Sequence, residues 1–269
     1  MDGAAGRDAL AQGAHLLEGV LVLNQRGLGA CGVTARVFVA EAQTLLFTCR
    51  ISAPARVRVT TIKRETALAA LPARDTTTVL ERVNPLYPQF IAAQDVLETG
   101  FDNIGAMFHP TTTILSVGRI ESGVPFEFYR DMTPSIAHFI EVMDAERLTV
   151  AKAYGVHAQS ACEWLARSYE GITGDTLYDR IQSNVAYRGI AAPRSIDTRY
   201  IWEDVPTGLV PMVALGNLAG VEMPASSGIV NVACALCRRD FWQEGRSAAR
   251  LGVAGLNISQ VKALVKNGP

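Results

Sequence analysis

The stretch TPSIAHFIEVMDAERLTVAKAYG, residues 133–155, predicts the main structural feature of this chain. Thr133 suits the N-cap of a helix and Pro134 its first position, while Gly155 is a typical stop signal. Between these signals, apolar side chains recur at helical spacing along one stripe, namely Ile136, Phe139, Ile140, Met143, Val150 and Tyr154. The pattern predicts a long helix with one face in a core.

Helical patterns also dominate the rest of the second part of the chain. They cover residues 100–107, 160–169, 176–182, 204–218, 226–237 and 258–265. The change of character follows Pro85, Tyr87 and Pro88. We therefore expect a boundary near Gln94 and an all-helical domain over residues 95–269.

The first part, residues 1–94, indicates a strand-rich α/β segment. A helical pattern over residues 8–18 precedes Val20 to Leu23, which are all apolar, as in a parallel strand covered on both faces. Shorter apolar runs follow at residues 37–39, 44–47 and 57–62. An α/β segment followed by helices is the layout of many two-domain dehydrogenases, although layout alone does not define function.

The composition excludes several classes of protein. Hydrophobic residues make up 49% and charged residues 19%, which favours a globular core over disorder. The net charge of −1 argues against nucleic acid or anionic lipid as a partner. There is no apolar run long enough for a membrane helix and no signal-peptide pattern, and five scattered cysteines suit a reducing, cytoplasmic setting.

Four histidines are candidates for proton transfer, and His109 stands out among them. It lies in the stretch DNIGAMFHP, residues 102–110, where Pro110 is expected to end the preceding helix and to restrain the histidine backbone. A fixed imidazole of this kind suits a general acid or base. A buried, hydrogen-bonded core histidine is an equally good interpretation.

A second candidate group lies in RYIWEDVP, residues 199–206. Arg199 precedes an expected helix start and could clamp a substrate carboxylate, while Asp204 could orient an imidazole. The alternative is an ordinary ion pair with a helix cap. Cys234 and Cys237 have metal-ligand spacing but are better interpreted as two cysteines within a helix.

Taken together, these stretches resemble the octopine/nopaline (opine) dehydrogenase family. EAQTLLFTCR at 41–50, DNIG to His109-Pro110, DAER at 144–147, and Arg199 to Pro206 with LVP at 209–211 occur in the family's order. The resemblance implies a Rossmann-like cofactor domain followed by an all-helical substrate domain. It also implies an enzyme that reductively joins an amino acid to a 2-oxo acid, with NAD or NADP as cofactor and no metal.

The resemblance also assigns roles to individual residues. His109 would be the catalytic acid or base, Asp204 its partner and Arg199 a carboxylate anchor. Cys49, from a strand spanning residues 41–50, would line the amino-acid pocket, and Trp164 would stack against the substrate. We expect His109 and Asp204 to lie within hydrogen-bond reach, and Arg199 to open onto the same cleft.

The chain departs from the family pattern at its N-terminal end. No Gly-x-Gly-x-x-Gly follows a strand, and Gly27-Leu28-Gly29 is not that fingerprint. Residues 1–94 are therefore expected to form only the second half of a Rossmann-like parallel-sheet domain, with Asn24 and Gly27 as candidate cofactor contacts. The alternative is a non-catalytic helical binding or dimerisation module, and a homo-oligomer is compatible with either.

Overall fold

The long helix predicted from residues 133–155 is present in the computed structural model, which describes residues 37–268. Helix α6 (Pro134–Ala153) begins after Thr133, whose hydroxyl accepts from the amide of Ile136 at 3.3 Å. The chain leaves the helix through Gly155, which has a φ of 71°. This prediction is confirmed in its cap, its first residue and its stop.

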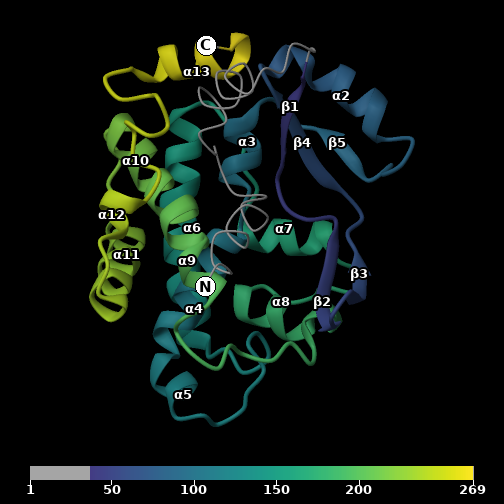
Figure 1. Cartoon of the computed structure of the whole chain (residues 1–269), viewed down its shortest axis with the longest axis vertical. Helices are drawn as coiled ribbons and strands as arrows, with labels where there is room; N and C mark the ends of the chain where they lie inside the picture. Colours follow the sequence, from purple (N-terminus) through teal and green to yellow (C-terminus); the bar gives the residue numbers. More distant parts are fainter. Residues whose placement is uncertain (1–36, 269) are drawn as a thin grey trace, which may run out of the picture.

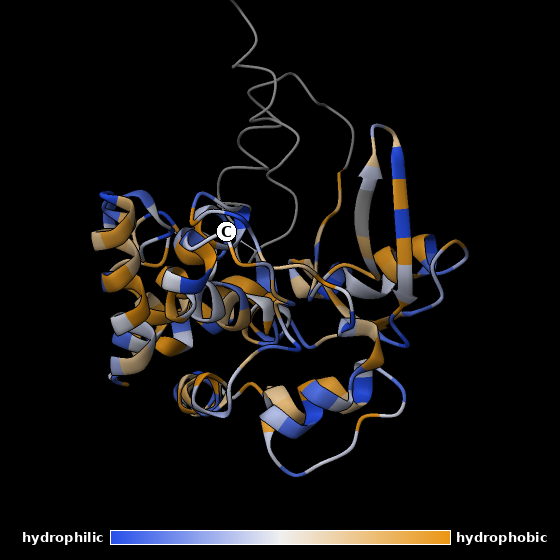
Figure 2. Ribbon diagram, turned by 90° about the horizontal axis from the view of Figure 1, so that it is seen from below, coloured by the Kyte–Doolittle hydropathy of each residue, from blue (hydrophilic) through white to orange (hydrophobic). Residues whose placement is uncertain are grey.

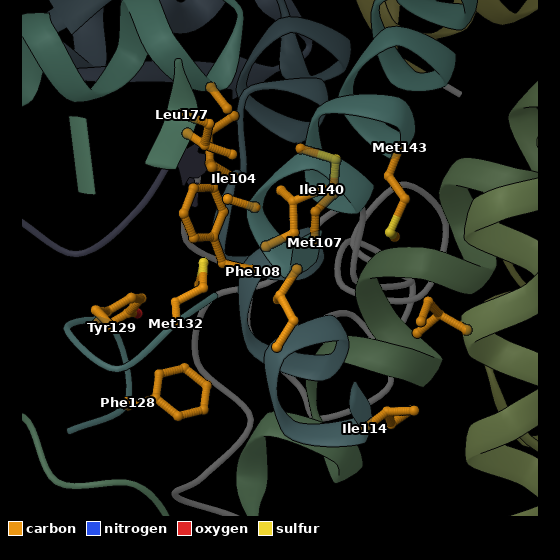
Figure 3. Packing of buried hydrophobic residues seen from close by; sticks show 14 of the residues in the cluster. Ile104, Met107, Phe108, Ile114, Phe128, Tyr129, Met132, Ile140, Met143 and Leu177 are labelled. Carbon is orange, nitrogen blue, oxygen red and sulfur yellow. The ribbon is translucent and has the colours of Figure 1, made fainter. Parts of the chain in front are cut away.

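Helix α6 lies among the other helices of the second part of the chain (Figure 1). These are α3 (Val96–Phe101), α4 (Gly105–Leu115), α5 (Val117–Glu121), α7 (Ala161–Ser168), α8 (Leu177–Ser183), α9 (Arg199–Trp202), α10 (Val210–Ala219), α11 (Pro224–Cys237), α12 (Phe241–Glu244) and α13 (Ile258–Asn267). Met107 and Phe108 of α4 belong to one buried cluster with Ile140 and Met143 of α6 (Figure 3). Burial of such apolar surface is the main force that holds these helices together.

The strands form two small sheets. Strands β1 (Val39–Ala42), β4 (Thr66–Leu71) and β5 (Phe90–Ala92) make a sheet in the order β1-β4-β5, and helix α2 (Thr76–Val83) connects the last two. Strand β4 pairs antiparallel with β1 and parallel with β5, and all its residues are buried. The predicted class, a partial α/β sheet followed by a helical part, is confirmed. The expected parallel pairing is found between β4 and β5, whereas the other pairs of described strands, β1–β4 and β2–β3, are antiparallel.

The predicted single strand over residues 41–50 is wrong, because the chain changes sheets within it. Strand β1 ends at Ala42, and β2 (Phe47–Ala53) begins a separate antiparallel hairpin with β3 (Arg56–Ile62). Gln43 lies at the change of direction, where its side chain donates to the carbonyl of Asp102 at 3.2 Å. The hairpin projects from the body of the molecule, and β3 alternates hydrophilic and hydrophobic residues (Figure 2).

Two further predictions need correction near the candidate site. Pro110 does not end the helix before it but lies inside α4, where the hydroxyl of Thr113 donates to the carbonyl of His109 at 2.7 Å. The proline removes one backbone donor, and the helix continues on the bonds of the residues that follow. The helix expected over residues 204–218 is divided into the π-helical segment η4 (Val205–Leu209) and α10.

The sheet and the helices share a hydrophobic cluster across the expected boundary near Gln94. Ala67 and Leu71 of β4 pack in it with Phe101 of α3, Val150 of α6 and Val265 of α13. Within residues 37–268, no helix has both the length and the apolar character needed to cross a membrane. The expected helix at 8–18, the strand at 20–23, and Asn24 and Gly27 lie outside the described residues.

Candidate active site

His109 and Asp204 are brought together by helices that are distant in sequence. The Nδ1 atom of His109, on α4, lies 2.9 Å from Oδ2 of Asp204, which precedes η4. The Asp204 carboxylate is almost fully buried and forms no side-chain cap on η4. The predicted juxtaposition is confirmed. Such a carboxylate accepts the Nδ1–H bond, which fixes the tautomer and the orientation of the imidazole.

Two tyrosines that sequence reasoning missed complete the surroundings of the imidazole. The hydroxyl of Tyr129 lies 3.0 Å from Nε2 of His109, and the ring of Tyr200 stacks on the imidazole at 4.4 Å between centroids. Tyr200 neighbours the candidate Arg199 and could have been noticed. Tyr129 lies in the loop between α5 and α6, where no pattern marks it. Both ring nitrogens thus have polar partners, and one ring face is covered.

Two glycines allow the elements around the imidazole to approach closely. A Cβ atom on Gly208 of η4 would lie 2.5 Å from Cβ of Ala106 on α4, which is closer than side-chain atoms pack. A Cβ atom on Gly105 would lie 3.3 Å from Cε1 of His109. The absence of a side chain at Gly208 therefore lets η4 and α4 hold Asp204 and His109 at hydrogen-bond distance.

A pocket opens beside His109, and the other predicted site residues line it. Arg199, Cys49 and Trp164 all contribute to its wall together with His109. Arg199 is well exposed, with Nε 3.5 Å from Oε2 of Glu203. Trp164 is buried and meets Tyr169 edge to face, with the ring centroids 5.9 Å apart. The expectation that Cys49 faces the same cavity as His109 is thus confirmed, with β2 as the element that carries Cys49.

Tyrosines also join the hairpin side of this pocket to its helical side. The rings of Tyr129 and Tyr187 stack at 4.1 Å, and Tyr169 meets Tyr187 at 5.5 Å. The hydroxyl of Tyr169 lies 3.3 Å from the Thr48 hydroxyl on β2. Burial raises the pKa of Tyr187 well above its ordinary value, so this phenol stays protonated near neutral pH.

Lys63 is a further pocket residue that the sequence did not reveal. It follows β3, lines the pocket and is only 5% exposed. Its Nζ donates to the carbonyl of Leu45 at 2.5 Å. Burial lowers the pKa of Lys63 to about 8, with a smaller opposing influence from Cys49. In the sequence, Lys63 stands beside Arg64 and Glu65, a context typical of a solvated surface.

A second charged cluster lies between the end of α3 and α6, just before α4 begins, and is closed to solvent. Arg147 of α6 is fully buried, and its guanidinium donates to Oδ1 of Asp144 at 2.6 Å and to the carbonyl of Phe101 at 2.6 Å. The same group lies 3.5 Å from Oδ1 of Asp102 and also donates to the carbonyl of Gln159. Burial raises the pKa of Asp102 to about 6, and the Arg147 charge opposes that change.

The described residues contain no typical binding site for the pyrophosphate of a dinucleotide. Such a group usually rests on a Gly-rich turn between a strand and a helix N-terminus. In residues 37–268, β4 is instead followed by Pro72 and a short 3₁₀ turn at residues 73–75. The candidate cofactor contacts, Asn24 and Gly27, lie in the part of the chain that is not described. Among the described residues, no group of three or more His, Cys, Asp or Glu is arranged to hold a metal.

Residues 92–237 match the family model described as NAD/NADP octopine/nopaline dehydrogenase, alpha-helical domain. The chain is 40% identical over 231 residues to an opine dehydrogenase of Arthrobacter sp. (strain 1C), covering 86% of the chain and 64% of the relative. It is 26% identical to a vitopine synthase of Allorhizobium ampelinum, covering 82% of the chain and 61% of the relative. The chain thus spans less than two-thirds of the length of these relatives.

Solved structures show the same fold. An octopine dehydrogenase with NADH and L-arginine superposes with a TM-score of 0.72 at 21% identity, covering 95% of this chain and 70% of the other. A yersinopine dehydrogenase with NADP⁺ gives a TM-score of 0.68 at 13% identity, covering 94% and 69%. At these identities the likeness concerns the fold alone.

Proposed function

This chain belongs to the octopine/nopaline dehydrogenase family, and on that premise we propose that it serves the NADH- or NADPH-dependent reductive condensation of an amino acid with a 2-oxo acid. The observation that carries this proposal is the contact between His109 and Asp204 at the edge of a pocket that Arg199 also lines. Similar enzymes are known with NADH and with NADP⁺. The nicotinamide nucleotide would supply the hydride.

The chemistry requires a proton carrier beside the reacting carbon. The amine attacks the keto carbon to give a carbinolamine, which loses water to form an imine, and hydride with a proton then yields a secondary amine. His109 is proposed to move the protons through Nε2, while Asp204 holds Nδ1. For this, the substrate would replace the Tyr129 hydroxyl that now occupies Nε2.

Substrate orientation is assigned to the pocket wall. The Arg199 guanidinium is proposed to bind the carboxylate of the 2-oxo acid, which suits its paired N–H donors. Cys49 and Trp164 are proposed to contact the amino-acid substrate from the hairpin side and from α7. Holding both reactants at one imidazole would make their condensation effectively unimolecular.

The proposal is tested by incubating this chain with NADH or NADPH and a panel of paired 2-oxo acids and amino acids. Oxidation of the nucleotide and a secondary-amine dicarboxylate detected by mass spectrometry are the expected results. If no pair gives such a product, the catalytic assignment fails. Absence of nucleotide binding by titration calorimetry, together with absence of product, would favour the alternative of a non-catalytic module.

A further inference from the structure

Lys63 is a buried cation that lines the same pocket. The roles proposed for His109, Asp204 and Arg199 do not explain its presence there. Lys63 is 5% exposed, and its ammonium donates to a backbone carbonyl, that of Leu45. Within residues 37–268, no carboxylate forms an ion pair with it, and burial lowers its pKa with a smaller opposing influence from Cys49. A charged group removed from water without a counterion is costly, so proteins seldom bury one without a purpose.

An anionic ligand group would compensate this cost. An ammonium has several N–H donors, and a single carbonyl leaves some of them for a ligand. The lowered pKa, about 8, shows that burial disfavours the charge, and a carboxylate in the pocket would act in the opposite sense. Lys63 therefore has both the position and the unused donors of an anion contact.

The position of Lys63 suggests which anion it would meet. Lys63 and Cys49 come from the hairpin side of the pocket, whereas His109 and Arg199 come from α4 and α9 on the helical side. The imine formed in the proposed reaction carries one carboxylate from each reactant. With Arg199 assigned to the 2-oxo acid, the second carboxylate needs a cation on the other side of the reacting carbon.

Resting on the proposed function, we propose that Lys63 binds the carboxylate of the amino-acid half of the substrate, opposite Arg199. The pocket would then hold a dicarboxylate between two cations, with the imidazole of His109 beside the bond that forms. The ligand class is a secondary amine or imine with a carboxylate on each side. Lys63 would thus determine specificity for amino acids over simple amines.

The first test measures binding and needs no turnover. Titration calorimetry of the unmodified chain with iminodiacetate, the smallest secondary-amine dicarboxylate, should show binding at least about tenfold tighter than that of its monoamide. Lys63→Met should abolish this preference, and Lys63→Arg should retain it. Lys152→Met, which removes an exposed lysine on α6, is the matched control and should leave both affinities unchanged.

The second test assigns the half of the ligand. With pyruvate and the most active amino acid, Lys63→Met should raise the KM of the amino acid about tenfold or more and change that of pyruvate little. Arg199→Met should do the converse. Lys63→Gln replaces Lys63→Met if the methionine variant has a lower Tm than the unmodified chain.

The outcomes separate this inference from the proposed function. If the unmodified chain does not bind iminodiacetate, or if Lys63→Met binds it equally well, the role proposed for Lys63 is wrong even if the chain is an active dehydrogenase. Preferential binding that depends on Lys63 supports it even where no condensation product forms, and in that case the catalytic proposal alone is lost.

Discussion

Two charged clusters lie on either side of the start of α4, and they differ in how completely their polar groups are enclosed. Around Arg147, the guanidinium has no exposure, its two carboxylate neighbours have at most 8%, and it donates to carbonyls as well. At His109, the imidazole keeps 19% exposure and lines a pocket. Its second nitrogen meets a hydroxyl, a partner that a substrate can replace.

This difference in enclosure distinguishes a charged cluster that stabilises the fold from one that can take part in chemistry. A guanidinium held by two carboxylates and two carbonyls has no donor direction open to a ligand, so the Arg147 cluster ties α3, α6 and the segment at Gln159 together. The imidazole is held firmly on its Nδ1 side only. General acid–base catalysis requires such a combination of fixed orientation and one reachable nitrogen.

The largest effect is expected on breaking the enclosed cluster. Arg147→Met leaves Asp144 and Asp102 buried without their cation, which should lower the free energy of unfolding by about 3–5 kcal/mol in urea titrations. Arg119→Met removes an exposed pair with Asp131 and should cost less than about 1 kcal/mol. Similar losses for the two variants would contradict the structural interpretation of Arg147.

The pH dependence of stability offers a second test of enclosure. Burial raises the pKa of Asp102 from 3.8 to about 6, so the folded state binds this proton more tightly than the unfolded chain. The resulting stabilisation is complete below about pH 4 and is lost as pH rises through 6, about 3 kcal/mol at about 1.4 kcal/mol per unit. Relative to Asp102→Asn, the unmodified chain should lose stability across this window.

The control for this window is an exposed carboxylate. Asp131→Asn, which makes the same substitution at a carboxylate that is 39% exposed, is the matched control for the change of side chain itself. The measurement is the free energy of unfolding of each variant at several pH values between about 4 and 7. A difference between the unmodified chain and Asp102→Asn that stays constant over this range would show that Asp102 keeps its ordinary pKa in the folded protein.

The open cluster should respond chiefly in activity. His109→Ala should lower turnover in the proposed condensation roughly a hundredfold, about 2.7 kcal/mol in the barrier, because the proton carrier is lost. His138→Ala is the matched control, since that side chain is 76% exposed on α6. Equal turnover of the two variants would remove His109 from the mechanism.

Much of the fold could be predicted because its signals are local. Thr133, Pro134 and Gly155 mark their own helix, and the Ser160 cap marks α7. The errors arose where tertiary contacts override a local rule. Pro110 lies inside α4, and the apolar run after Glu41 hides a change of sheet at Gln43, which depends on the carbonyl of Asp102 far along the chain.

The candidate site likewise contains residues that the sequence indicated and residues that only the structure revealed. The resemblance supplied His109, Asp204 and Arg199, which the fold brings to one pocket. Tyr129 and Lys63 could not be found from sequence, because a tyrosine in a loop and a lysine beside charged neighbours look like ordinary surface residues. Their importance comes from burial and direction, which only the packing of the hairpin against the helices creates.

The smallest expected effect tests whether close packing sets the geometry of the open cluster. Gly208→Ala would place its Cβ 2.5 Å from that of Ala106, so η4 and α4 must move apart, at a cost of about 1–3 kcal/mol in the free energy of unfolding. Because these elements carry Asp204 and His109, turnover in the proposed reaction should also fall, by roughly tenfold at most.

A compensating substitution distinguishes lost spacing from a general effect of the added methyl group. Ala106→Gly in the Gly208→Ala background removes the opposing Cβ and should restore both stability and turnover in large part, with a coupling energy of about 1 kcal/mol or more. Gly228→Ala is the control, since its Cβ meets nothing within 4 Å on α11, and a helical alanine there should stabilise by up to about 1 kcal/mol. Additive losses in the double variant would mean that the approach of η4 to α4 does not govern the His109–Asp204 contact. The dyad would then owe its geometry to its own hydrogen bond and to the tyrosines around it.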